Sequence, residues 1–112
     1  MKKNTDIEAI GKTLAPVFRK YRVLRALVFG SMARGEATRR SDVDLILIQD
    51  TDKRFFDRYD GLFEDVGTKI KDRAVEMLIY TPQELEKIKH RPFVARALRE
   101  GKTIYEHTQK YP

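Results

Sequence analysis

The feature that most constrains the fold is a set of three short apolar blocks separated by stretches with helical spacing. The blocks are Val23–Phe29, Val43–Ile48 and Ala74–Tyr80. They are rich in Val, Ile and Leu and are too short for core helices, which favours β-strands. Strands that alternate with helical segments predict a small β-sheet with helices packed against it, in an α/β or α+β fold.

The first part of the chain should form one or two helices before the first strand. Thr5 and Glu8 match a capping box, and apolar residues then recur at helical spacing as far as Tyr21. Pro16 lies inside this pattern and is expected to kink or divide the helix. After the first strand, a second short helix is expected from residue 32 to about residue 37.

A third helix is expected over residues 55–70, where aromatic and aliphatic residues recur at helical spacing. Gly61 and Gly67 weaken this prediction. The Phe and Tyr side chains of residues 55–63 are expected to belong to the core. The alternative is that some of them form an exposed patch for a helix of a partner protein.

The segment that follows the third apolar block has clear helix boundaries. Thr81–Glu84 combines an N-cap Thr, a Pro at the first helical position and a Glu at the third, which predicts a helix to about Lys89. Another helix is expected over residues 93–100 and ends before Gly101. Residues 102–106 are expected to form a short last strand.

The composition narrows the class of protein. The 112 residues suggest one domain spanning residues 1–112. No apolar run approaches the ~20 residues that would cross a bilayer, and no secretory signal is apparent. The chain has no Cys, which excludes disulfides and thiolate metal sites, and only two His residues, too far apart to suggest a metal site. We therefore expect a soluble cytoplasmic protein without membrane contact.

The net charge of +6 is unevenly distributed. Residues 1–40 carry ten Lys and Arg against three Asp and Glu, whereas the rest of the chain is nearly balanced. Such a basic segment attracts polyanions: nucleotides, nucleic acid or an acidic partner. A solvated basic surface without a ligand is the alternative, and composition does not choose between them.

Two acids lie at the start of the second strand, Asp42 directly before it and Asp44 within it. Because alternate residues of a strand point to one side, Asp42 and Asp44 should share a face, while Val43, Leu45 and Leu47 build the core from the other. Two ionised carboxylates on one face repel each other. A hard divalent cation removes this penalty, and Mg²⁺ is typically held by one or two carboxylates, waters and phosphate oxygens. The pair therefore predicts a magnesium site.

A glycine turn follows the first strand. Gly30 lets the backbone turn tightly and approach a ligand, and Ser31 offers a hydroxyl and an N–H at the start of the expected short helix, where a phosphate binds well. If the first two strands pair, this turn meets the acidic pair at one end of the sheet. Arg34, Arg39 and Arg40 lie between them in sequence and could neutralise phosphate charge. Arg39 and Arg40 could equally serve only solubility.

Glu76 is the candidate for a third acid, because it interrupts the third strand. If that strand lies beside the second, Glu76 could face Asp42 and Asp44. A carboxylate in this position helps to activate the attacking oxygen in two-metal sites. The alternative is an edge-strand Glu that faces water. A metal that bridges phosphates beside an anion-binding turn is typical of phosphoryl or nucleotidyl transfer.

These motifs resemble a known family. Gly30-Ser31-x-Ala33-Arg34-Gly35 followed by Ser41-Asp42-x-Asp44-Leu45 is similar to the signature of the minimal nucleotidyltransferases, which belong to the polymerase-beta-like nucleotidyltransferase superfamily. Residues 80–85 and 97–106 also resemble that family, so the resemblance covers most of the chain. It implies a palm-like mixed sheet flanked by helices.

The resemblance also implies Mg²⁺-dependent transfer of a nucleoside monophosphate from a triphosphate such as ATP. Carried over by position, Gly30 and Ser31 would hold the triphosphate, with Arg34 and Arg40 nearby, and the acidic pair would bind the metal. Glu76 stands where the family usually has a third Asp. The Asp-to-Glu difference affects the residue that would act as the catalytic base and as the third metal-binding carboxylate.

Many stand-alone members of this family are similar to the antitoxin half of a two-gene module whose partner is an all-helical HEPN toxin, an RNase. The resemblance implies neutralisation of the toxin by transfer of AMP to a toxin tyrosine, by tight binding, or by both. A binding-only antitoxin with an idle site is the second hypothesis, favoured by the Asp-to-Glu departure. A basic nucleic-acid-binding domain ranks last, because no basic stretch is interleaved with aromatic residues.

Overall fold

The computed structural model describes residues 2–36 and 41–107. The elements follow in the order α1 (Lys2–Lys20), β1 (Val23–Phe29), β2 (Val43–Gln49), the 3-10 helix η1 (Phe55–Tyr59), α2 (Leu62–Lys69), β3 (Val75–Tyr80), α3 (Pro82–Ile88), α4 (Pro92–Glu100) and β4 (Lys102–Glu106). Within this part of the chain, no helix is both long enough and apolar enough to cross a membrane.

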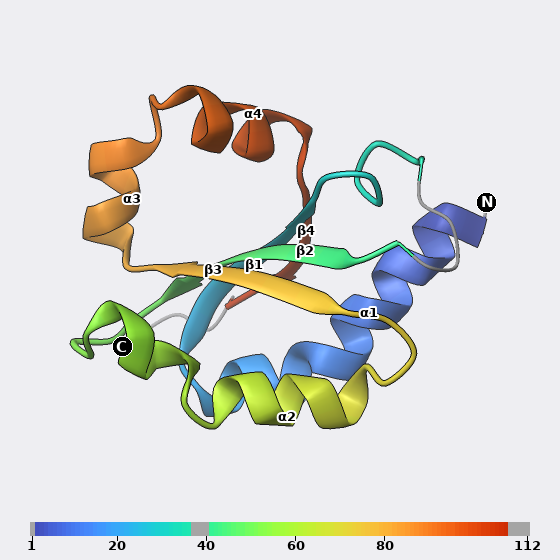
Figure 1. Cartoon of the computed structure of the whole chain (residues 1–112), viewed down its shortest axis with the longest axis horizontal. Coiled ribbons are helices and arrows are strands. Elements are labelled where there is room, and N and C mark those ends of the chain that lie inside the picture. Colours follow the sequence, from blue (N-terminus) through green and yellow to red (C-terminus); the bar gives the residue numbers. More distant parts are fainter. Residues whose placement is uncertain (1, 37–40, 108–112) are drawn as a thin grey trace.

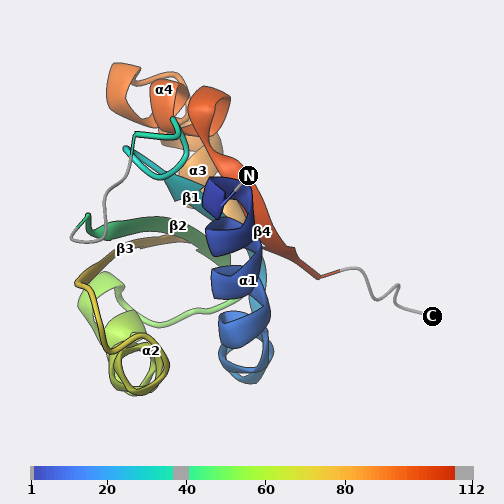
Figure 2. The same ribbon diagram turned by 90° about the vertical axis from the view of Figure 1, so that its right-hand side faces the viewer.

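The four strands form one mixed sheet in the order β3-β2-β1-β4. β1 pairs antiparallel with both β2 and β4, whereas β2 and β3 run parallel. Helices α1 and α2 cover one face of the sheet, and α3 and α4 lie over the other (Figures 1 and 2). The expected small mixed sheet flanked by helices is confirmed.

The face covered by α1 and α2 carries the larger core. Alternate residues of β2 point into it, and Val43, Leu45 and Leu47 are fully buried there, together with Leu14 and Phe18 of α1. The opposite face is covered more thinly: its buried cluster consists of Leu27, Ile46, Ile48 and Ala97. Because strand side chains alternate, Asp44 lies on this second face, between the sheet and the α3–α4 layer.

Helix α1 differs from the sequence prediction at its start and at its proline. The helix begins at Lys2, so Thr5 lies within it and is not the N-cap. The helix also continues through Pro16 as one element. The proline nitrogen carries no hydrogen, so the carbonyl one turn earlier receives no helical hydrogen bond from it. The side chain of Pro16 is exposed, so water can bind this carbonyl instead.

The expected short helix after β1 is a turn. Its hydrogen bonds run from Arg34 N to Gly30 O at 3.1 Å and from Glu36 N to Ser31 O at 2.9 Å, a mixed pattern that does not propagate as a helix. Positive φ angles at Gly30 and Gly35 bracket the segment and explain why it turns instead. Residue 37, where the helix was expected to end, lies outside the described residues.

The helix expected over residues 55–70 is divided into η1 and α2. Gly61 has a φ of +77° and breaks the backbone between them. The expectation that the aromatic stripe belongs to the core is wrong for Phe55, Phe56 and Phe63, which are 37%, 83% and 53% exposed. After the break, α2 buries Leu62 and leaves Phe63 exposed. Phe55 and Phe56 are exposed on η1.

Candidate active site

Strand pairing brings the predicted acids and the glycine turn together. β1 is antiparallel to β2, so the end of one strand meets the start of the other, and Phe29 pairs with Asp44. β2 and β3 are parallel, so their starts coincide, and Asp44 pairs with Glu76. Phe29, Asp44 and Glu76 therefore form one row across three strands, with Gly30 directly beyond it.

Gly30 lies against the Asp44 carboxylate. A Cβ atom at position 30 would be 2.5 Å from Oδ2 of Asp44, closer than any side chain could approach without displacing it. Gly30 also has a φ of +73°, which L residues rarely adopt. Both observations favour glycine here, and the half-buried Ser31 follows within the turn.

The carboxylates repel one another. The pKa of Asp44 is raised above its ordinary value, chiefly because burial disfavours the charged form, and further because Glu76 and Asp42 lie nearby. Arg34 opposes this effect and lowers the pKa of Asp44. Asp42 and Glu76 are exposed, whereas Asp44 is partly buried. The predicted acids thus occupy one electrostatic environment, with Arg34 close enough to interact.

These residues fit a hard cation that is also held by its substrate. Among the described side chains, no three His, Cys, Asp or Glu residues are arranged to hold a metal ion together, and the three-carboxylate metal site of Asp42, Asp44 and Glu76 stays a prediction. Mg²⁺ needs only one or two carboxylates, completed by waters and phosphate oxygens. Asp42 and Asp44 supply carboxylate oxygens, and their mutual repulsion is what a divalent cation would relieve.

Arg34 is held by two carboxylates at the edge of the site. Its Nε donates to Oε1 of Glu36 at 3.0 Å, and one of its terminal nitrogens lies 3.7 Å from Oε1 of Glu100. Arg96 also contacts Glu100, 3.2 Å away. Two guanidinium groups therefore flank the turn. The predicted site residue Arg40, like Arg39, lies outside the described residues.

A cleft opens in front of the carboxylate row, between the sheet and α4. Its larger cavity measures about 700 Å³ and is lined by Phe29, Asp44, Glu76, Met77, Leu78, Tyr80 and Phe93. An adjoining cavity of about 140 Å³ is lined by Phe29, Gly30, Arg34, Phe93, Arg96, Ala97 and Glu100. The predicted site residues did not include Phe93, because only the return of α4 over the sheet brings Phe93 to this cleft.

Comparison with known proteins identifies the family. The polymerase beta nucleotidyltransferase family matches residues 12–110, which is most of the chain. The chain belongs to this nucleotidyltransferase family. No curated protein gave a significant match to the sequence.

Solved structures agree with this nucleotidyltransferase fold. The crystal structure of a toxin–antitoxin with AMP-PNP has a TM-score of 0.61 and 16% identity, over 88% of this chain and 74% of that chain. A candidate nucleotidyltransferase from Sulfolobus solfataricus has a TM-score of 0.62 and 16% identity, over 99% of this chain and 90% of that chain. The similarity is confined to the fold at these identities.

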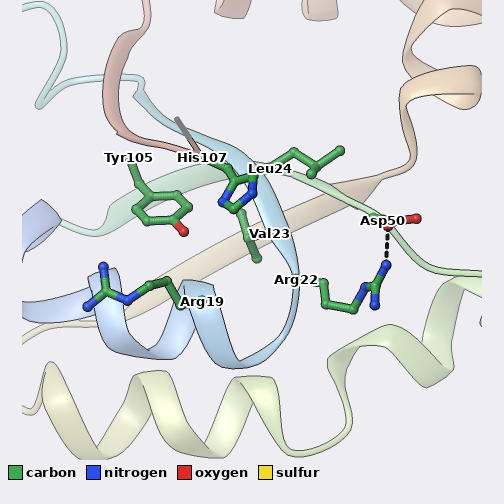
Figure 3. Close-up of a pocket in the computed structure, with 7 residues that line it drawn as sticks. All are labelled: Arg19, Arg22, Val23, Leu24, Asp50, Tyr105 and His107. Atoms are coloured by element: carbon green, nitrogen blue, oxygen red, sulfur yellow. Dashed lines mark hydrogen bonds and ion pairs between the residues drawn. The ribbon is translucent and has the colours of Figure 1, made fainter. Parts of the chain in front are cut away.

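A separate cavity lies at the opposite end of β1. It measures about 300 Å³ and is lined by Arg19, Arg22, Val23, Leu24, Asp50, Tyr105 and His107. Figure 3 shows Arg22 paired with Asp50 on one side of this cavity. None of the residues that the sequence assigned to the nucleotidyltransferase site lines this cavity.

Proposed function

We propose that the chain is a Mg²⁺-dependent nucleotidyltransferase that transfers AMP from ATP to a hydroxyl group of a partner protein. The acceptor is a tyrosine of a cognate HEPN toxin, so residues 1–112 act as the antitoxin domain of a toxin–antitoxin pair. One observation carries this proposal: the glycine turn packs against the Asp44 carboxylate, 2.5 Å from a Cβ placed at Gly30, with Glu76 on the next strand.

The binding roles follow from chemistry and position. Gly30 and Ser31 bind the triphosphate of ATP through the turn, and Arg34 exchanges its contacts with Glu36 and Glu100 for a phosphate oxygen. Arg40 adds positive charge from the following segment. Mg²⁺, held by Asp42 and Asp44, supplies neutralisation of the phosphate charge that develops during transfer.

Transfer requires one bond to form and one to break. The acceptor hydroxyl oxygen attacks the α-phosphorus of ATP, and the bond from this phosphorus to the bridging α–β oxygen breaks. Pyrophosphate leaves with the bonding electron pair, and the hydroxyl proton passes to the carboxylate of Glu76. The exposure of Glu76 leaves it accessible to a group presented by another protein.

The assignment of a protein acceptor is supported by the similar fold of a solved toxin–antitoxin with AMP-PNP. It is also supported by the exposed Phe55, Phe56 and Phe63, which offer apolar contact area.

A transfer assay tests the proposal. The chain is incubated with ATP labelled on the α-phosphate, Mg²⁺ and the all-helical product of a neighbouring gene. Wild type should label the partner, and Asp44→Asn should lose the activity by a factor of about 100 or more. Asp52→Asn, an exposed acid beyond β2, is the matched control and should keep full activity. Equal labelling by wild type and Asp44→Asn would reject the enzymatic proposal.

The second candidate is an antitoxin that neutralises its partner by binding alone. The exposed Phe55, Phe56 and Phe63 favour it, because such area can contact a partner without chemistry. In this case the double substitution Asp42→Ala/Asp44→Ala still protects cells that express the toxin. Loss of protection by this variant, with unchanged binding to the toxin, would reject the candidate.

A further inference from the structure

Phe93 is an exposed aromatic residue at the mouth of the cleft. Its side chain is 58% exposed, although its ring packs edge-on against Phe29, with the ring centroids 5.7 Å apart and an angle of 87°. Phe29 is the residue that pairs with Asp44. An apolar ring is therefore held open to solvent directly beside the carboxylate row.

The two cavities of the cleft meet at Phe29 and Phe93. One of them contains Asp44 and Glu76, and the other contains Gly30, Arg34 and Arg96. Phe93 thus borders both the carboxylates and the guanidinium groups.

The larger cavity has the chemistry of a small-molecule site. Its volume of about 700 Å³ falls in the usual range for ligand pockets, which are mostly apolar with a few polar groups. Acids occupy one end, near Glu76. Leu78 and Tyr80 follow on the same strand face, and Tyr80 lies roughly 13 Å farther along the strand by its rise per residue.

We propose that Phe93 stacks against the base of the nucleoside triphosphate, and so forms the nucleobase subsite of this enzyme. The proposal rests on the nucleotidyltransferase function proposed above. The Phe93 ring lies next to the turn proposed to bind phosphate and the acids proposed to bind metal. The remaining apolar surface, with Leu78 and Tyr80, borders the same space.

The ligand on Phe93 is the base of ATP and not the acceptor tyrosine. Phe93 lines both cavities: it shares the smaller one with Gly30 and Arg34, on the phosphate side of the site, whereas Glu76, the proposed base for the acceptor, lines only the larger one. A group tethered to the phosphates therefore reaches Phe93.

The protein can lose this ring without losing its fold. α4 is held to the molecule by the buried Val94 and Ala97, and Pro92 at its first position fixes the backbone that presents Phe93. Phe93→Ala therefore changes the cleft, and urea unfolding should confirm that the variant remains folded.

The test compares the affinities of ATP and of inorganic tripolyphosphate, each with Mg²⁺, by calorimetry on the full chain. Phe93→Ala should weaken ATP binding about tenfold, the usual effect of removing one base–aromatic stack, and leave tripolyphosphate binding unchanged. Phe93→Tyr should restore ATP affinity, whereas Phe93→Leu should not. Phe56→Ala, which removes an exposed ring on η1, is the matched control and should bind ATP as wild type does.

The outcomes separate the subsite from the function. If Phe93→Ala binds ATP as Phe56→Ala does, or weakens tripolyphosphate equally, the subsite proposal is wrong while the function stands. Unchanged ATP affinity with a raised KM for the partner protein would instead assign Phe93 to the acceptor. If wild type binds neither ATP nor tripolyphosphate, the proposed function fails and the subsite falls with it.

Discussion

Glu84→Gln should destabilise the protein, because it removes one half of the ion pair that connects η1 to the start of α3. Two terminal nitrogens of Arg58 contact the two carboxylate oxygens of Glu84 at 2.7 and 2.8 Å. Arg58 also donates to the backbone oxygens of Lys53 and Ile79. Its side chain is only 6% exposed, so its buried charge needs the Glu84 carboxylate to compensate it.

The pKa of Glu84 gives the magnitude. It is lowered from 4.5 to about 2, chiefly by the hydrogen bonds from Arg58. A difference of this size corresponds to at most about 3.4 kcal/mol of unfolding free energy at neutral pH. The Glu84 side chain is 42% exposed, so solvent screens the pair, and we expect a loss of about 2 kcal/mol. For a chain of this length, the melting temperature should fall by about 8 °C.

Urea unfolding at pH 7 measures the loss. Glu86→Gln is the matched control on the same helix, because Glu86 is 71% exposed and pairs only with Lys89 among the described residues; it should change stability by less than about 0.5 kcal/mol. Equal stability of the two variants would refute the reasoning.

The pH dependence gives a second test of the same pair. Because the folded-state pKa of Glu84 lies below the unfolded value, the unfolded chain binds the proton more tightly. The contribution is therefore complete above pH 4.5 and is lost as the pH falls toward 2. The stability difference between wild type and Glu84→Gln should shrink over this interval. A difference that stays constant from pH 7 to pH 3 would contradict the assigned pKa.

Two further predictions concern the site itself. Gly30→Ala should cost about 1–2 kcal/mol of stability because of the positive φ, and should weaken Mg²⁺-ATP binding because the added methyl group displaces the Asp44 carboxylate. Gly67→Ala is the control, because the space around Gly67 is open. It should preserve binding and stabilise α2 by up to about 1 kcal/mol. Equal ATP affinity of the two variants in calorimetry would contradict the role of the turn. Asp44→Asn should raise the unfolding free energy by about 0.5 kcal/mol, because it removes the burial cost of the charged carboxylate and relieves repulsion from Glu76 and Asp42. The same variant should abolish the rise in melting temperature that Mg²⁺-ATP gives to wild type. A variant less stable than wild type would show that Asp44 is stabilising in the free protein.

The features predicted well depend on local signals. The three apolar blocks became β1, β2 and β3, with boundaries shifted by one residue at most. The predicted helix start at Thr81 is confirmed in every part. The Thr81 hydroxyl accepts a hydrogen bond from Glu84 N, the Glu84 carboxylate accepts one from Thr81 N, and Pro82 is the first residue of the helix. The meeting of the glycine turn and the acidic pair was also predictable, because neighbouring strands of this length have few ways to pair.

The features predicted poorly depend on contacts distant in sequence. Helical periodicity could not reveal that Gly61 breaks the segment, because a glycine within such a pattern is compatible with both a continuous and an interrupted helix. Which side of α1 faces solvent decides whether Pro16 is tolerated, and this follows only from packing. Phe93 shows no local link to Asp44; their proximity results from the path of the chain through α3 and α4.

The unequal covering of the two sheet faces has an evolutionary consequence. Most of the buried apolar residues lie beneath the sheet, whereas the cleft residues lie above it, on alternate positions of the same strands. Mutations of the exposed and half-buried cleft residues on the upper face should therefore cost less stability than mutations of the buried residues on either face. Substitutions in α3 and α4 can thus reshape the cleft, while the lower positions preserve the scaffold.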